Sequence, residues 1–318
     1  MLDALIYSLF AILGLLLILL IATFGIFIKI FFSPKRKFDE EYPIPDGDAY
    51  EAHREQMVKW IKQAREMEHR DVSITSRDGL TLRGRYYEHK PGAPIEILFH
   101  GYRGTAERDL SGGVCRCHSI GHSALIVDHR ASGRSDGHVI TFGKKESLDC
   151  LSWVDFVLRE IDVNAKIILT GISMGAATVM IASSMKLPPN VIGVLADCGY
   201  SSTEKIIKKV IGDMKLPAKP IYPLVRLGAL LFGGFKPDTP SPVEAMRRAT
   251  LPTLFVHGDA DGFVPYTMSE ENYEACASEK KRLVIIKGAD HGLCFPVGRE
   301  DYLNELKAFF DPLTKVDA

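Results

Sequence analysis

The stretch that decides the fold is Lys166-Ile-Ile-Leu-Thr-Gly-Ile-Ser-Met-Gly-Ala-Ala-Thr178. An apolar, β-branched run leads into Gly-Ile-Ser-Met-Gly, which predicts a strand, a sharp turn and a helix. Ser173 would lie at the apex in an unusual backbone conformation, and Gly171 and Gly175 would be small because the chain passes close to itself there. Free amides at the helix start favour a developing oxyanion, so the position suits a nucleophile. Taken alone, the motif also fits a serine that only caps the helix.

Around this stretch, apolar strand-like runs alternate with helical patterns such as Glu146–Leu158. Two alternating runs, Asp71–Ser76 and Leu80–Glu88, come first and are joined through Arg77-Asp78-Gly79, which predicts an antiparallel hairpin. The later runs are Ile95–Phe99, Ala124–Val127, Ile167–Thr170, Val191–Ala196, Thr253–Val256 and Leu283–Ile286. This order predicts an α/β fold with a mainly parallel eight-stranded sheet and helices on both faces.

Polar residues follow most of these strands. They include His100-Gly-Tyr-Arg-Gly after the third, Asp128-His-Arg after the fourth, His257-Gly-Asp-Ala-Asp-Gly after the seventh and Gly288-Ala-Asp-His-Gly after the eighth. The carboxyl ends of parallel strands meet at one edge of a sheet, where active sites lie. A serine hydroxyl needs an imidazole base and a carboxylate that orients the imidazole. The chain offers these groups in the order Ser, Asp, His, which is the order of α/β-hydrolases.

From about Val72 to Phe310 the chain resembles the α/β-hydrolase superfamily, on the motifs G-I-S-M-G, H-G-D-A-D-G-F-V-P, G-A-D-H-G and H-G-Y-R-G. The loop D-H-R-A-S-G-R-S-D-G resembles that of the esterase and serine-aminopeptidase-like branches, with Ala131 where their pattern has Gly. The whole chain is similar to uncharacterised membrane-anchored hydrolases of Gram-positive bacteria. The likeness implies a fold and a chemistry but no substrate.

The resemblance also implies a set of site residues. They are the nucleophile Ser173, the acid Asp261, the base His291, and the oxyanion-hole N–H groups of Tyr102 and Met174. Asp259 and Asp290 are rival acids. Asp290 adjoins His291 in sequence, so its side chain should point elsewhere, and Asp259 lacks the spacing of the motif. We therefore expect Asp261 to be the acid.

Other polar residues near the strand ends are expected to be structural. His100 would make hydrogen bonds beneath the oxyanion loop, and His257 would support the acid loop. Asp128 and Arg130 are expected to form a buried pair that fixes the loop after the fourth strand. As an alternative, Arg130 or Arg134 touches the substrate.

The N-terminal segment from Ala4 to Ile28 contains no charged residue. About 25 residues at 1.5 Å each exceed a hydrocarbon core of roughly 30 Å, which predicts a transmembrane anchor over residues 1–32. A cleaved signal peptide is the alternative, although no basic n-region or cleavage site is present. The basic flank is formed by Lys29, Lys35, Arg36 and Lys37 and predicts a cytoplasmic catalytic domain.

Residues 33–70 are expected to form a linker and an amphipathic helix that opens with a capping box at Asp48 and Glu51 and runs to about Glu68. One of its faces is apolar, formed by Met57, Trp60, Ile61, Ala64 and Met67. This face would pack on the catalytic domain or, alternatively, lie along a membrane surface. The hydrolase domain is assigned to residues 71–318. Residues 200–248 are expected to form a helical lid insertion over the site, with an apolar substrate-binding lining that includes Tyr222, Phe232 and Phe235.

With 318 residues and a formal charge of −1, the chain gives no electrostatic reason to bind nucleic acid, and we expect no nucleic-acid partner. Six scattered cysteines favour reduced thiols over a disulfide framework. Two of them, Cys115 and Cys117, lie near His118 and His122 without the usual ligand spacing, so no metal site is expected. The sequence implies no cofactor and leaves the oligomeric state open.

The function expected from these residues is that of a membrane-anchored serine hydrolase, namely a carboxylic-ester hydrolase acting on a small-molecule apolar acyl ester through an acyl-enzyme. An amidase or peptidase acting on small peptides would use the same triad. From a different class, the alternative is a non-catalytic, membrane-anchored binding scaffold on a hydrolase fold. The intact set of nucleophile, acid and base argues against the scaffold.

Overall fold

The computed structural model describes residues 1–34 and 41–315, and within them one eight-stranded sheet has the order β1-β2-β4-β3-β5-β6-β7-β8. Only β1 with β2 and β2 with β4 are antiparallel. The strands are β1 (Arg70–Thr75), β2 (Thr81–Tyr87), β3 (Ile95–Phe99), β4 (Ser123–Val127), β5 (Ile167–Ile172), β6 (Val191–Asp197), β7 (Thr253–Gly258) and β8 (Lys281–Ile286). The predicted fold class is confirmed, including the entry through an antiparallel hairpin.

Helices cover both faces of the sheet. Successive side chains of the central strands point to opposite faces, so each face carries apolar side chains that the helices bury. Ile97 and Phe99 of β3 pack with α5 (Lys144–Phe156) and α6 (Met174–Ser183). Leu98 between them packs with α4 (Ala106–Ser119) on the other face. The remaining helices of the domain are α9 (Pro242–Met246), α10 (Thr267–Ala275), α11 (Cys294–Val297) and α12 (Arg299–Thr314), and a π-helical turn, η1 (Val157–Ile161), follows α5.

The register of the sheet brings the carboxyl ends of its parallel strands to one edge. Phe99 pairs with Gly171 and Gly171 with Ala196, and Asp197 next to it pairs with Val256. The loops that follow β3, β5, β6, β7 and β8 therefore begin side by side. This shared edge is where residues far apart in the sequence meet.

The predicted amphipathic helix is two helices, α2 (Asp48–Glu51) and α3 (Arg54–Glu66). The predicted capping box is wrong, because Gly47 with φ +124° occupies the cap position and Asp48 is already helical. The expected packing is present: Trp60, Ile61 and Ala64 are buried. The indole of Trp60 lies so close to Gly112 of α4 that a Cβ there would be 2.8 Å from the ring.

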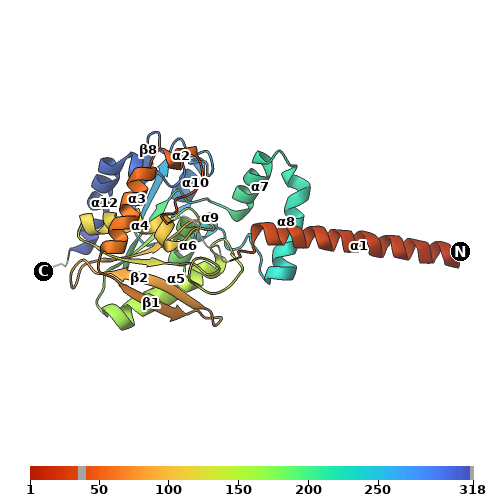
Figure 1. Cartoon of the computed structure of the whole chain (residues 1–318), viewed down its shortest axis with the longest axis horizontal. Helices are drawn as coiled ribbons and strands as arrows, with labels where there is room; N and C mark the ends of the chain where they lie inside the picture. The colour runs from red at the N-terminus through yellow and green to blue at the C-terminus, as the bar shows by residue number, and fades with distance from the viewer. Residues whose placement is uncertain (35–40, 316–318) are drawn as a thin grey trace.

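Helix α1 (Leu2–Ile30) projects away from the sheet as a single long rod (Figure 1). Of the described residues, it alone forms a helix long and apolar enough to cross a membrane. Most of its side chains are exposed, but Thr23 and Phe27 are buried and Phe31 just beyond it is fully buried. Its last two turns therefore pack against the rest of the protein.

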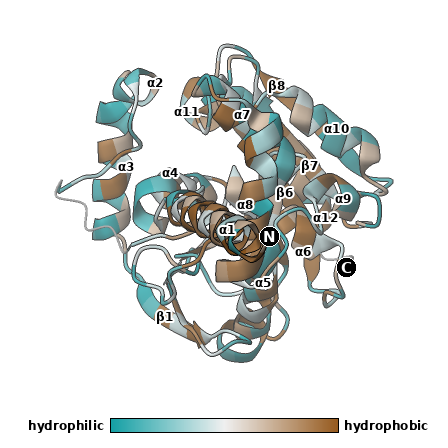
Figure 2. Ribbon diagram, turned by 90° about the vertical axis from the view of Figure 1, so that its right-hand side faces the viewer, coloured by the Kyte–Doolittle hydropathy of each residue, from teal (hydrophilic) through white to brown (hydrophobic). Residues whose placement is uncertain are grey.

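The insertion between β6 and β7 contains α7 (Thr203–Asp213) and α8 (Ala218–Gly233), followed by α9. Helix α8 lies against α1 next to the domain (Figures 1 and 2). A Cβ on Gly228 of α8 would lie 3.0 Å from the carbonyl oxygen of Thr23, so the two backbones approach closely at this point. Phe232 makes ring contacts with Phe24 and Phe27 of α1 at centroid distances of 5.0 and 5.7 Å.

Candidate active site

Ser173 lies at the turn between β5 and α6 with φ +57° and ψ −114°, the unusual conformation that the sequence predicts. The residues two positions before and two positions after Ser173 have to be glycine. A Cβ on Gly171 would lie 2.2 Å from the carbonyl carbon of Gly175, and a Cβ on Gly175 would lie 2.0 Å from the carbonyl oxygen of Phe99. The turn therefore forms only with these two small residues, and it raises the hydroxyl of Ser173 above the end of the sheet.

The structure brings Ser173, His291 and Asp261 together in one hydrogen-bonded chain. The His291 Nε2 atom is 2.9 Å from the Ser173 Oγ, and the His291 Nδ1 atom is 2.7 Å from the Asp261 Oδ2. An ionised carboxylate only accepts, so we assign the imidazole proton to Nδ1. The lone pair of Nε2 then faces the serine hydroxyl, and this arrangement lets His291 take the hydroxyl proton.

Asp261 is held by donors on both of its oxygens. Oδ1 accepts from the backbone N–H groups of Phe263 at 2.9 Å and Val264 at 2.7 Å, and Oδ2 accepts from His291 and from His257 Nε2 at 3.1 Å. Burial by itself raises the pKa of Asp261, but the hydrogen bonds from the two imidazoles and from Val264 outweigh it and hold the pKa well below its ordinary value. The group is a carboxylate at neutral pH.

The rival acids face backbone amides. Asp259 accepts from the N–H of Gly288 at 2.6 Å, and Asp290 accepts from the N–H groups of Gly262 at 3.1 Å and His291 at 2.7 Å. Each carboxylate thus ties the loop after β7 to the loop after β8. Asp261, as expected from the sequence, is the one that meets the imidazole of His291.

His257 supports the acid loop, as the sequence suggested. Its Nε2 donates to the carbonyl oxygen of Val264 at 2.9 Å as well as to Asp261, and its Nδ1 is 2.6 Å from the Ser269 Oγ. It therefore links the carboxylate to α10.

The loop after β3 lies beside Ser173, since a Cβ on Gly101 would be 3.6 Å from the Cβ of Ser173. Beneath it, His100 Nδ1 donates to the Gly101 carbonyl at 2.7 Å, and His100 Nε2 accepts from the N–H of His129 at 3.0 Å. Burial lowers the pKa of both imidazoles, so they are neutral supports. The predicted oxyanion donors Tyr102 and Met174 flank Ser173 from this loop and from the first position of α6, where helix amides lack intrahelical partners.

The expected pair between Asp128 and Arg130 is wrong. Arg130 instead makes a bidentate pair with Asp149 at 2.7 Å for each bond, and it also reaches Asp78 at 2.9 Å. The Asp128 carboxylate accepts from two backbone N–H groups, that of Ala106 at the start of α4 and that of Arg134 in the loop after β4. Arg130 therefore joins α5 to the turn of the hairpin, while Asp128 holds the loops after β3 and β4 together.

Two cavities meet at Ser173. One, of about 640 Å³, is bordered by charged side chains including Arg103, Arg108 and Lys209 and by residues 45–50, which lead into α2. The other, of about 520 Å³, has an almost entirely apolar lining drawn from three helices and from the loop residues Tyr102, Arg103, Phe142, Tyr200 and Phe263. Its apolar residues include Ile26 and Ile30 of α1, Ile206, Ile207, Val210 and Ile211 of α7, Met214 and Leu216 after α7, and Ile221 of α8.

The residues that the sequence suggested for an apolar substrate lining lie elsewhere. Phe232 packs on α1, Phe235 packs edge-on against Phe31 at 5.2 Å, and the hydroxyl of Tyr222 donates to Asp238. The two phenylalanines fix the insertion to α1 and the residue that follows it, Tyr222 bonds within the insertion, and neither cavity at Ser173 includes these side chains in its lining. Sequence reasoning missed the contribution of α1, because nothing in an apolar run indicates which of its turns packs on protein.

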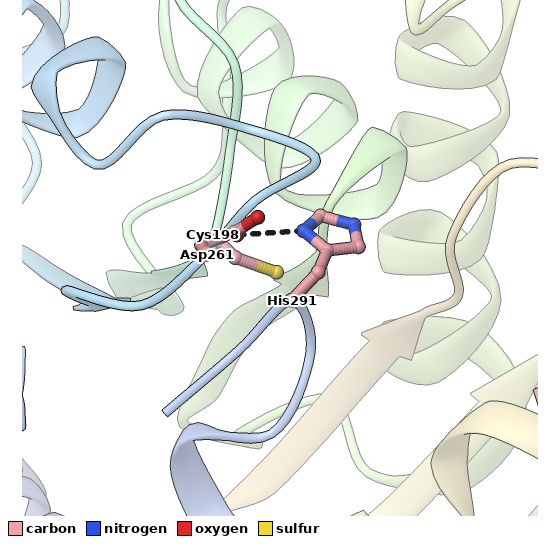
Figure 3. A group of neighbouring side chains, drawn as sticks. All are labelled: Cys198, Asp261 and His291. Atoms are coloured by element: carbon pink, nitrogen blue, oxygen red, sulfur yellow. Dashed lines mark hydrogen bonds and ion pairs between the residues drawn. The ribbon is translucent and has the colours of Figure 1, made fainter. Parts of the chain in front are cut away.

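Cys198 follows β6 and lies next to the His291–Asp261 pair (Figure 3). One ligand-capable atom from each of these three residues lies within 4.8 Å of the others. Burial raises the pKa of the Cys198 thiol well above its ordinary value, which favours the neutral thiol. His291 Nδ1 is already hydrogen-bonded to Asp261, and the thiol beside this pair is neutral. We therefore do not assign a metal to the cluster.

The family described as serine aminopeptidase, S33, matches residues 239–296, which contain both Asp261 and His291. The protein YqkD of Bacillus subtilis is 26% identical over 193 residues, which are 60% of this chain and 63% of YqkD, so the match spans less than two thirds of that relative. Rv2307c of Mycobacterium tuberculosis is 29% identical over 70% of this chain and 72% of its own length.

Solved structures give the same fold. The Pyrococcus furiosus esterase Pf2001 superposes with a TM-score of 0.69 at 22% sequence identity and covers 90% of this chain and 99% of its own. The esterase EaEST of Exiguobacterium antarcticum superposes with a TM-score of 0.57 at 17% identity, over 76% of this chain and 99% of its own. The strand order, the sharp turn at Ser173 and these likenesses together show that the chain has the α/β-hydrolase fold.

Proposed function

We propose that this protein is a membrane-anchored serine hydrolase that cleaves carboxylic esters with apolar acyl groups. The observation that carries the proposal is the chain of hydrogen bonds from Ser173 through His291 to Asp261, at the point where an apolar cavity meets a cavity bordered by charged side chains. A binding role alone would require neither this alignment nor the backbone conformation of Ser173.

In the proposed reaction the Ser173 Oγ attacks the ester carbonyl carbon while His291 Nε2 takes its proton. The N–H groups of Tyr102 and Met174 stabilise the oxyanion of the tetrahedral intermediate. The intermediate collapses when His291 returns the proton to the departing alcohol, which leaves an acyl-serine. Water then attacks the acyl-serine with His291 again as the base, and the carboxylic acid and free Ser173 are released. Asp261 stabilises the imidazolium throughout.

The two cavities support a division of the substrate between them. An acyl chain fits the apolar cavity, where each buried methylene contributes about 0.8 kcal/mol. A polar alcohol group fits the side lined by Arg103, Arg108 and Lys209. On this reading kcat/KM rises from acetyl to medium-chain acyl esters and charged acyl groups are disfavoured, because a charge in the apolar cavity would lose its hydration.

Helix α1 is proposed as the membrane anchor. Its 29 residues span about 44 Å at 1.5 Å each, more than a hydrocarbon core of roughly 30 Å. The burial of Phe27 and Phe31 in the protein favours a retained helix over a cleaved signal peptide. Lys29 and three basic residues at 35–37, which lie outside the described residues, favour a cytoplasmic domain. Protease added outside intact cells should spare the domain, and its digestion would contradict this orientation.

A second candidate is a small-peptide amidase or peptidase, favoured by the family match and by acidic residues that border the larger cavity, among them Asp46 and Asp48, which suit a substrate amino group. Matched ester and anilide substrates with the same acyl group separate the two. Faster turnover of the ester by a wide margin supports the esterase, and comparable rates support the amidase.

The deciding experiment is Ser173→Ala in the purified full-length protein. We expect hydrolysis of a short nitrophenyl ester to fall by several orders of magnitude, and labelling by a fluorophosphonate probe to disappear. Ser184→Ala, which removes a hydroxyl after α6 and away from the site, is the matched control and should retain both. A wild-type protein that folds but is not labelled would favour a non-catalytic scaffold.

A further inference from the structure

Helix α1 is hydrogen-bonded to the loop after β3, which carries the proposed oxyanion donor Tyr102. The hydroxyl of Tyr102 donates to the carbonyl oxygen of Ile30 at 2.6 Å, and the guanidinium of Arg103 donates to the carbonyl oxygens of Lys29 at 2.8 Å and Phe32 at 3.0 Å. These carbonyls are at the C-terminal end of α1, where backbone acceptors lack helical partners. The membrane helix and the catalytic loop therefore form one structural unit.

The same end of α1 forms a wall of the apolar cavity. Ile26 and Ile30, one helical turn apart, line it from one side, and α7 and α8 line it from the others. Ser173 lies where this cavity meets the one bordered by charged side chains, since it lines both. An acyl chain bound to Ser173 would run along the side of a helix whose other end continues into the bilayer.

Helix α8 crosses α1 on the membrane side of Lys29. The close contact is with Thr23, six residues before Lys29, which corresponds to about 9 Å along the helix axis. Helices that lie in a membrane interface reach about 5–10 Å into the boundary between headgroups and acyl chains. If Lys29 lies at the level of the headgroups, the crossing point of α8 and α1 lies at that depth.

The outer surface of the insertion carries exposed apolar and basic side chains, which suit a position at the depth of the lipid headgroups. Four large apolar side chains are about half exposed: Met214 at 47%, Leu216 at 46%, Leu230 at 49% and Leu231 at 54%. Two of them, Met214 and Leu216, also line the apolar cavity, so the exposed apolar surface and the cavity are continuous. Lys215 and Lys219 beside them are exposed cations that suit anionic headgroups.

We propose that the substrate is an ester resident in the bilayer, and that its acyl chain reaches Ser173 laterally, through the mouth at Met214 and Leu216 and along the wall formed by α1. This inference rests on the proposed serine-hydrolase function and adds the substrate's source and route. Helix α1 is then part of the acyl site as well as an anchor.

The test uses the full-length protein in vesicles of phosphatidylcholine with phosphatidylglycerol and two fluorogenic probes. 4-Methylumbelliferyl oleate partitions into the bilayer, whereas 4-methylumbelliferyl acetate reports the triad from water. Ile26→Trp narrows the cavity from α1, and Val210→Trp narrows it from α7. Loss of room for two methylenes should lower the ratio of kcat/KM for the oleate to kcat/KM for the acetate by about tenfold or more, because only the long chain extends past the added indole. Ile28→Trp, on an exposed position of α1, is the matched control and should leave both rates unchanged.

The route is tested by Leu216→Glu at the mouth. A carboxylate there should lower the ratio of oleate to acetate hydrolysis in vesicles by about tenfold or more, because a charge facing hydrocarbon is costly. Val163→Glu, a 70% exposed apolar residue remote from the insertion, is the control. If oleate hydrolysis in vesicles is unchanged in Leu216→Glu and in both cavity-narrowing variants, the lateral route is wrong. Acetate hydrolysis that depends on Ser173 would still support the proposed function, so the two failures are distinguishable.

Discussion

Replacement of Asp261 by Asn tests the assignment of the acid most directly. Asp261 accepts four hydrogen bonds, two from backbone amides on Oδ1 and two from imidazoles on Oδ2. The asparagine oxygen can keep the two amide donors, which turns its NH₂ group toward His291 Nδ1. An NH₂ group only donates here, so it selects the tautomer with the proton on Nε2. His291 can then no longer accept the proton of Ser173.

The magnitude follows from this loss of the base. The wrong tautomer in a serine triad lowers kcat by about 10⁴-fold, which corresponds to about 5.4 kcal/mol of transition-state stabilisation. We expect this loss in Asp261→Asn for hydrolysis of 4-methylumbelliferyl acetate, with a KM close to wild type because the carboxylate does not contact the substrate. Fluorophosphonate labelling should slow by a similar factor.

Asp259→Asn and Asp290→Asn are the matched controls, because each keeps an oxygen that can accept from the amides of the facing loop. Both should retain activity within about tenfold of wild type, since they change loop positions and leave the imidazole partner intact. The reasoning would be refuted if Asp261→Asn kept more than a tenth of the wild-type kcat while one of the other two variants lost several orders of magnitude.

Three further outcomes can be checked on the folded protein. Arg116→Met leaves the carboxylate of Glu96 buried without its bidentate partner and should lower the free energy of unfolding by about 3–5 kcal/mol in urea, whereas Arg282→Met at an exposed pair should cost less than about 1 kcal/mol. The pKa values of Glu96 and Asp261 are held below their ordinary values, so the stability that they contribute is present above about pH 4 and is lost as the pH falls below it; acid titration of Asp261→Asn should show a smaller loss than wild type, and an equal loss would contradict this. Among the six free cysteines only Cys115 is not buried, so a thiol reagent should modify one thiol rapidly in native protein and all six after unfolding, and rapid native modification of a second would contradict the burial pattern.

Much of the fold could be predicted because the signals are local. The run from Ile167 to Ile172 is apolar and β-branched, and the glycine at 171 is required by a steric contact within the turn itself, whereas the glycine at 175 is required by the neighbouring strand end at Phe99. The strands alternate with helices in an order that allows few arrangements other than a parallel sheet. Ser173, Asp261 and His291 stood at strand ends that such a sheet brings together, and their hydrogen bonds agree with the expectation.

The sequence-based predictions that failed did so for different physical reasons. Arg130 was expected to pair with Asp128 two residues away, but side chains of neighbouring positions diverge, and the fold offers Asp149 and Asp78 instead. The residue types of a capping box are present at Asp48 and three positions later, but Gly47 is the capping residue, and Asp48 already lies inside the helix.

The sequence by itself determined the sheet, the turn at Ser173 and the three residues that meet there, because backbone sterics and strand order depend on short stretches. Only the tertiary structure decided what surrounds the nucleophile. An apolar residue has no directional bonding, so Phe232 and Phe235 could equally have lined a substrate cavity or packed on another helix. The long-range packing of α8 on α1 assigned them to the helix contact and gave the cavity its wall of Ile26 and Ile30.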